Sequence, residues 1–210
     1  PDLATLRRWV TEMRVVPSDE LRVGDSAWTR VSDHHDLREA FAGQDESPLR
    51  VHLGQGLSRG ERMDWAIQKA TELGVSEITP LISERCEVRL NDERADKRLA
   101  HWRQIAISAC EQCGRSVLPI IHAPVTLRDW LDVEADLKLV LHPVAEPLAS
   151  HAKPQSLAFL IGPEGGFSPG ERAALLALQS TRRLALGPRI LRADTAVVAA
   201  IAQFQLFGGH

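Results

Sequence analysis

From residue 49 onward, short apolar runs alternate with longer segments whose apolar residues recur every three or four positions. The apolar runs predict buried strands, and the spacing of three or four predicts amphipathic helices. Strands are expected at residues 49–53, 76–82, 137–141, 157–161 and 183–186, and helices at residues 60–73, 97–114, 169–179 and 195–207. This alternation is typical of an α/β domain whose mostly parallel sheet is covered by helices on both faces.

The first 47 residues follow a different pattern. They predict short β-rich pieces separated by polar turns, with residues 21–25 as a strand that ends in a turn. Residues 43–48 are polar, end in Pro48 and show no periodicity, as expected of a linker. The sequence therefore predicts a small β-rich domain over residues 1–47 and a larger α/β domain over residues 48–210.

Two loops that follow predicted strands contain both glycine and proline. Residues 162–167 (GPEGGF) follow one strand, residues 186–192 (LGPRILR) follow another, and residues 141–143 (LHP) end a third. Ligands of parallel sheets bind at the carboxyl ends of strands, where glycine leaves the main chain accessible and proline stiffens the loop. We therefore predict a preformed binding site, the alternative being a set of ordinary strand-to-helix turns. Neither loop has the pattern of a Rossmann dinucleotide site or a P-loop.

Residues 56–60 (GLSRG) match the G-x-S-x-G nucleophile elbow of α/β hydrolases. In that interpretation Ser58 is the nucleophile and a later histidine, His142 or His151, is the base. However, the chain has no HGGG-type oxyanion loop, the elbow follows only one strand, and the two glycine loops stay unexplained. A hydrolase is therefore disfavoured.

With a net charge of −3, the surface as a whole does not attract nucleic acid. Binding of a polyanion would therefore require a local basic patch. Arginines interleaved with tryptophans in the first domain offer such a patch. They are Arg7, Arg8, Arg14, Arg22, Arg30 and Arg38, with Trp9 and Trp28. The alternative is an ordinary solvated surface.

No apolar run approaches the roughly 20 residues of a membrane span, and no signal-peptide pattern opens the chain, so we expect a cytoplasmic protein without a membrane partner. Three cysteines, an odd number, fit a reducing compartment. Cys110 and Cys113 form a C-x-x-C pattern inside a predicted helix, without a second such pattern. Because no His, Cys and Asp cluster has ligand spacing, no metal is expected.

Six motifs, in order along the chain, resemble those of the 16S ribosomal RNA uracil-N3 methyltransferases, which belong to the SPOUT class of knotted, S-adenosylmethionine-dependent enzymes. The motifs are residues 68–75 (QKATELGV), 78–80 (ITP), 83–86 (SERC), 111–115 (EQCGR), 161–167 (IGPEGGF) and 186–192 (LGPRILR). The resemblance extends over about residues 46–207. It departs from the family pattern at Asp194, where the family usually has Glu, and in the N-terminal region, which is shorter than the family's domain.

The resemblance implies a SPOUT-type α/β knot that forms a homodimer. A small, trimmed or incomplete β-barrel domain of the PUA-like kind, which helps to grip RNA, is expected to precede it. It also implies S-adenosylmethionine as the methyl donor, no metal, and 16S rRNA in the 30S ribosomal subunit as the partner. The implied donor-binding residues are Leu141, His142, Pro143, Gly162, Glu164, Gly165, Gly166, Leu186, Gly187, Ile190, Leu191 and Arg192.

The chemistry of this reaction assigns the expected catalytic roles. Uracil N3 carries a proton and normally points into a base pair, so the site must expose the base and remove that proton. Negative charge then spreads onto the flanking carbonyl oxygens, where Arg192 and Arg115 are expected to stabilise it. Glu111 or Glu164 is expected to receive the proton.

Purely structural roles for the same residues stay open. Glu111 and Arg115 could form an intrahelical ion pair, Arg192 could be a surface arginine at a helix start, and Glu164 could cap the helix that follows it. Two other functions also stay open: a ribose 2′-O-methyltransferase of the same class, and a non-catalytic RNA-binding protein that kept the fold.

Overall fold

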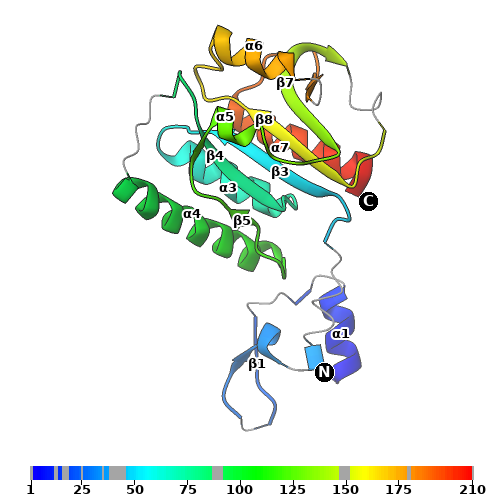
Figure 1. Cartoon of the computed structure of the whole chain (residues 1–210). Helices are drawn as coiled ribbons and strands as arrows, with labels where there is room; N and C mark the ends of the chain where they lie inside the picture. Colours follow the sequence, from blue (N-terminus) through cyan, green and yellow to red (C-terminus); the bar gives the residue numbers. More distant parts are fainter. Residues whose placement is uncertain are drawn as a thin grey trace.

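The structure is a computed structural model (Figure 1). It describes residues 2–11, 14–15, 19–24, 26–34, 36–37, 46–86, 92–146, 152–178 and 181–209. Among the residues singled out in the sequence, Asp25, Arg38, residues 43–45 and His151 lie outside the described part.

A seven-stranded sheet forms the centre of the molecule, and every strand pair in it is parallel. Its strands are β3 (Arg50–Gly56), β4 (Glu77–Ile82), β5 (Ile120–Ile121), β6 (Val125–Thr126), β7 (Leu137–Glu146), β8 (Ser156–Ile161) and β9 (Thr181–Leu184). The order across the sheet is β5-β4-β3-β8-β7-β9, and β6 also pairs with β4. The predicted parallel α/β sheet is confirmed.

Helices cover both faces of this sheet, as predicted. One core cluster joins the sheet to α3 (Glu61–Glu72), α4 (Asp92–Cys113) and α7 (Ala193–Phe204), with the buried rings of Trp102, Phe159 and Phe204 in it. The second cluster joins the opposite face to α5 (Leu127–Trp130) and α6 (Pro169–Ala177) through Trp130 and Leu175. Alternation along β8 explains the division, because Phe159 belongs to the first cluster and Leu160 to the second.

Most element ends fall within a few residues of the prediction. Gly74 and Gly114 follow α3 and α4 with φ of +84° and +81°, the left-handed conformation in which glycine ends a helix. Strands β5 and β6 and helix α5 were not predicted, because two to four residues carry no readable periodicity. None of the helices in the described ranges combines the length and apolar character that a membrane crossing requires.

The last helix ties together elements that are distant in the sequence. The chain leaves β9 at one edge of the sheet, and α7 then packs against β8 and α3 (Figure 1). The single π-helical segment η3 (Gln205–Gly209) continues α7, and the side-chain amide of Gln205 donates to the carbonyl of Leu73 at 3.0 Å. The C-terminal segment thereby closes the core on the α3 side.

The N-terminal region differs from the prediction of β-rich pieces. It contains the helix α1 (Leu3–Thr11), the antiparallel strands β1 (Glu20–Leu21) and β2 (Thr29–Arg30), and the 3₁₀ turn η1 (Val31–Asp33). Val10, Val31 and Leu37 form its small core, with Leu6 packed against it. Leu3, Leu6 and Val10 recur at helical spacing, a signal that the β interpretation missed. The PUA-like barrel and the boundary at residue 47 stay predictions.

Candidate active site

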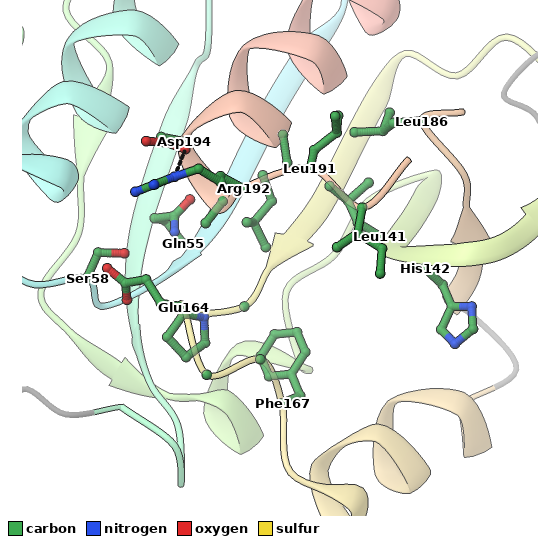
Figure 2. A pocket seen from close by; sticks show the side chains of 18 of the residues that line it. Gln55, Ser58, Leu141, His142, Glu164, Phe167, Leu186, Leu191, Arg192 and Asp194 are labelled. Carbon is green, nitrogen blue, oxygen red and sulfur yellow. Dashed lines mark ion pairs between the residues drawn. The ribbon is translucent and has the colours of Figure 1, made fainter. Parts of the chain in front are cut away.

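A cavity of about 800 Å³ opens at the carboxyl ends of β3, β8 and β9, beside the middle of β7 (Figure 2). Its wall comes from three segments: the residues after β3, the loop after β8 (162–167) and the loop after β9 (186–192). Leu141 and His142 of β7 complete it. The volume lies in the range of small-molecule sites, and the position is the one expected for ligands of parallel sheets.

The loop after β8 is locked against the end of β3. A Cβ atom added at Gly56 would collide with the backbone nitrogen of Pro163, so the two segments touch through their main chains. Gly166 turns the loop with φ of +65° and donates its amide to the carbonyl of Pro163 at 2.8 Å. Arg85, which also lines the cavity, holds the loop by donating to the carbonyl of Gly165 at 3.2 Å. This wall of the cavity is therefore preformed.

The loop after β9 forms the opposite wall. Gly187 has φ of +115°, and a Cβ atom there would meet nothing within 4 Å, so glycine is required by the backbone conformation and not by crowding. Leu186 and Leu191 pack against the main core, whereas Ile190 is 87% exposed. The loop is thus anchored at both ends and presents its middle to solvent.

The cavity has an apolar and a polar end. Figure 2 shows Leu141, His142 and Leu186 on one side, and Gln55, Ser58, Glu164, Arg192 and Asp194 gathered on the other. Gln55 is 1% exposed; its amide nitrogen donates to the carbonyl of Gly56 at 3.0 Å, and its Oε1 is one of the buried oxygens without a partner in the described part of the chain. A buried acceptor left unpaired is costly unless a bound molecule satisfies it.

Glu164 is held as a carboxylate at the polar end. Partial burial raises the pKa of Glu164, but hydrogen bonds from Arg62 and from the backbone amides of Glu164 and Arg59, with the charge of Arg62, outweigh burial and leave that pKa below its ordinary value. The Arg62 Nη1 to Glu164 Oε1 distance is 2.8 Å. A carboxylate with a low pKa is a weak base, so Glu164 suits the binding of a cationic ligand better than proton removal.

Arg192 lies where the loop after β9 enters α7. Its side chain is 67% exposed, and its Nε lies 3.6 Å from Oδ1 of Asp194. It occupies the N-cap position of α7, but its side chain makes no capping hydrogen bond. The guanidinium is therefore only loosely paired and faces the polar end of the cavity (Figure 2).

The structure brings together all of the predicted donor-binding residues except Pro143, which belongs to β7 but whose side chain is not described. The strand β7 continues to Glu146 because its pairing with β9 is irregular between Leu141 and Glu146. Leu141 and His142 therefore reach the cavity from the middle of a strand, and not from its end as predicted.

Arg115 and Glu111 do not line this cavity. Arg115 follows the end of α4; its side chain is 10% exposed, pairs with Glu46 and donates to the carbonyls of Thr71 and Val75 at 2.8 and 3.0 Å. Glu111 is paired with Arg30, with an Nη1 to Oε1 distance of 3.5 Å. The intrahelical pair between Glu111 and Arg115 considered above is not formed, because α4 ends at Cys113 and Gly114 turns the chain.

Several cavity residues lie outside the loops predicted as a binding site: Gln55, Arg62, Arg85 and Arg172. Phe167 and Arg189 lie within those loops but were not among the predicted donor-binding residues. Gln55 and Ser58 also lie at the carboxyl end of a strand, the place where ligands of parallel sheets bind. This rule identifies the other loops from the sequence, whereas the pattern of residues 56–60 indicates only a possible hydrolase elbow. Ser58 donates to the carbonyl of Gly56 at 3.5 Å, and Figure 2 shows His142 at the far end of the cavity. This geometry gives no support to a Ser58–His142 pair.

Comparisons with known proteins agree with this fold. The family model described as RNA methyltransferase domain matches residues 45–205. Proteins named ribosomal RNA small subunit methyltransferase E are similar: the one from Buchnera aphidicola (subsp. Schizaphis graminum) is 42% identical over 77% of this chain, and the one from Bacillus subtilis 32% over 75%. The matched region spans about two thirds of these relatives, 67% and 66% of their lengths.

Two solved structures resemble the whole chain. The ribosomal RNA small subunit methyltransferase E from Neisseria gonorrhoeae, bound to S-adenosylmethionine, superposes with a TM-score of 0.75 at 35% identity, covering 98% of this chain and 90% of that one. A Legionella pneumophila protein described as a methyltransferase, in complex with the same cofactor, gives a TM-score of 0.77 at 33% identity, covering 100% and 91%.

Proposed function

Because the chain belongs to the RNA methyltransferase domain family, we propose that it transfers a methyl group from S-adenosylmethionine to N3 of a uridine in the 16S rRNA of the small ribosomal subunit. One observation carries the proposal: the residues implied as donor-binding by the motifs line a single cavity at the carboxyl ends of parallel strands. The relatives named above support the small-subunit RNA as substrate.

The cavity offers the proposed donor an apolar and a polar end. The apolar end, with Leu141, Leu186 and Leu191, suits a flat adenine ring, and the glycine loops leave main-chain groups accessible to its edges. The polar end carries the carboxylate of Glu164, which suits a cationic ligand, and the unpaired Oε1 of Gln55. When bound, S-adenosylmethionine supplies an electrophilic methyl group on a sulfonium.

Arg192 is proposed to stabilise the charge that develops on the substrate. When N3 loses its proton, negative charge spreads to the two neighbouring carbonyl oxygens of the base. The guanidinium of Arg192 is permanently positive, and its loose pairing with Asp194 leaves donors free for one of those oxygens. Its position at the polar end places this charge beside the cavity.

Gln55 is proposed to orient the base. Its side chain lines the cavity beside the place of reaction, but it cannot take the proton from N3, since an amide is too weak a base. Among the described residues, the carboxylates that line the cavity are Glu164 and Asp194. With Glu164 held by Arg62, Asp194 beside Arg192 is the better-placed acceptor for the proton.

Further features implied by the resemblance are proposals of the same kind. We propose that the loops around the cavity belong to a trefoil knot, that the protein works as a homodimer in the cytoplasm, and that the N-terminal region helps to grip RNA. For Arg115 and Glu111 the contacts favour a structural role over the predicted catalytic one, because their partners lie outside the cavity.

The proposal is tested by incubating the purified protein with labelled S-adenosylmethionine and 30S subunits from a strain lacking this activity, followed by mass spectrometry of the nucleosides. We expect 3-methyluridine. Label on a ribose would replace the proposal with 2′-O-methylation. Failure to bind the donor in calorimetry would leave an RNA-binding protein without this catalysis.

A further inference from the structure

A second group of ligand-type side chains lies on the sheet, away from the cavity. His52 of β3 is paired in register with Glu77 of β4, and His122 directly follows β5, donating its amide to the carbonyl of Ile78 at 2.9 Å. Val51 and Leu53 point into the core under α3, so alternation places His52 on the other face, where its ring meets Trp130 of α5.

The three side chains lie close together, with the rings of His52 and His122 stacked at a centroid distance of 5.4 Å. His122 Nε2 lies 2.8 Å from Oε2 of Glu77, and His52 Nδ1 lies 3.9 Å from the same oxygen. One ligand atom from each residue can be chosen so that all lie within 4.8 Å of one another. In a tetrahedral zinc site with bonds of about 2.0–2.1 Å, neighbouring ligand atoms are roughly 3.4 Å apart. Shifts of about an ångström or less would therefore complete the geometry.

Neighbouring side chains fix the orientation of two of these ligands. Nε2 of His52 is hydrogen-bonded to Oγ1 of Thr79 at 2.8 Å, which leaves Nδ1 on the side of Glu77. Arg50 donates to Oε1 of Glu77 at 3.2 Å, which leaves Oε2 for the histidines. Metal-binding histidines and carboxylates are usually held in this way by a second hydrogen bond.

The exposure of the three side chains also suits an ion. The side chains of His52, Glu77 and His122 are 14, 21 and 38% exposed, so the group is sheltered but reachable from solvent.

We propose that His52, Glu77 and His122 bind one divalent transition-metal ion of the zinc class, with a water molecule in the fourth position. Two imidazoles and a carboxylate select zinc-like ions over Mg²⁺ or Ca²⁺, which prefer oxygen ligands. The ion would link β3, β4 and the end of β5, so we expect it to raise the stability of the fold. The proposal does not depend on methyl transfer.

The test is calorimetric titration of the chelator-treated protein with ZnCl₂, together with thermal unfolding with and without the ion. Glu77→Gln and His122→Gln are the test variants, and His101→Gln is the matched control, because His101 pairs with the carboxylate of Asp64 at 2.9 Å in a two-residue arrangement. We expect one Zn²⁺ per wild-type chain, a raised unfolding midpoint, and at least tenfold weaker binding in both test variants only.

Three results would overturn the proposal. They are no zinc binding by the wild-type chain, equal binding by wild type and both test variants, or a loss of binding in His101→Gln of the same size. Substitution with Co²⁺ gives an independent reading, because thiolate ligands produce an intense near-ultraviolet band and this set does not. Such a band would move the site to the cysteines and end the proposal.

Discussion

Arg192 lies at the wall of the cavity with most of its side chain exposed to solvent. Two thirds of its side chain are exposed, and its contact with Asp194 is loose at 3.6 Å. An interaction that strengthens only as charge develops on the substrate speeds the reaction, whereas one made equally throughout only tightens binding. The guanidinium fits the first description.

We predict that Arg192→Ala lowers the rate of methyl transfer about 100-fold while changing the affinity for S-adenosylmethionine by only a few fold. Single-turnover rates and calorimetric affinities of the same preparations measure the two effects. Arg183→Ala, an exposed arginine of β9 outside the cavity lining, should alter neither. Equal losses in rate and affinity would make Arg192 a binding residue instead.

Asp136, which is not among the cavity residues, shows how local hydrogen bonds can make the stability of the fold depend on pH. Its carboxylate accepts hydrogen bonds from the amides of Ser156 and Gln155, both at 2.9 Å, and fastens the start of β8 beside the start of β7. These two hydrogen bonds lower the pKa of Asp136, and the one from Ser156 has the larger effect. The stabilisation is therefore complete above the ordinary carboxyl pKa and is lost as the pH falls through the lowered one.

We predict that Asp136→Asn lowers the free energy of unfolding at pH 7, and that the difference from wild type is smaller at pH 3, which lies below the ordinary pKa of an aspartate carboxyl. Urea unfolding at both pH values checks this. Asp132→Asn, at an exposed position in the same connection, serves as the control. A difference that stays constant between pH 7 and pH 3 would mean that the carboxylate form has no special stabilising effect.

At the scale of elements, the cavity exists because strand ends meet without side chains between them. The end of β3 touches the loop after β8 at Gly56 and Pro163, and that loop is held by Arg85 and by the turn at Gly166. A β-carbon at position 56 would press on backbone, which cannot rotate away as a side chain can. The cavity shape is thus set by backbone packing.

We predict that Gly56→Ala destabilises the fold by about 1–3 kcal/mol and weakens binding of S-adenosylmethionine at least tenfold in the protein that remains folded. Thermal unfolding and calorimetry provide the two measurements. Gly170→Ala in α6 is the control, because its new β-carbon would only make an ordinary contact with Ser168 at 3.8 Å. A Gly56→Ala variant with unchanged affinity would show that the loop can move without harm.

At the scale of the whole molecule, Arg115 connects parts that are distant in sequence. It joins Glu46, just before β3, to the carbonyls of Thr71 and Val75 on either side of the end of α3. The residue lies only one position beyond Gly114, so it also fixes how the chain leaves α4. Its contacts therefore hold the segment that leads into β3 against the end of α3.

We predict that Arg115→Ala lowers the free energy of unfolding by about 3 kcal/mol, because it leaves Glu46 and two carbonyls without their partner. The affinity of the folded fraction for S-adenosylmethionine should stay within a few fold of wild type. Denaturant unfolding and calorimetry separate the two quantities. A stable Arg115→Ala variant that binds the donor but transfers no methyl group would restore the catalytic role.

The sequence predicted the parts of this molecule that local pattern determines. Apolar runs followed by glycine loops located the sheet and most of the cavity wall, because both depend on neighbours in the chain. The three ligand-type residues at positions 52, 77 and 122 could not be found from spacing, since separate strands bring them together. The partner of Arg115 was missed for the same reason, as Glu46 lies 69 residues away.

The position of α7 also has a consequence for how the protein folds while it is being translated. Residues 193–204 complete a core whose other half, α3, is made more than a hundred residues earlier, and the Gln205–Leu73 hydrogen bond spans 132 positions. Contacts this far apart in sequence make folding slow, because the intervening chain must be ordered first. During translation the part of α3 that packs against α7 therefore stays uncovered until those residues leave the exit tunnel, and chaperones and other nascent chains can bind it in that interval.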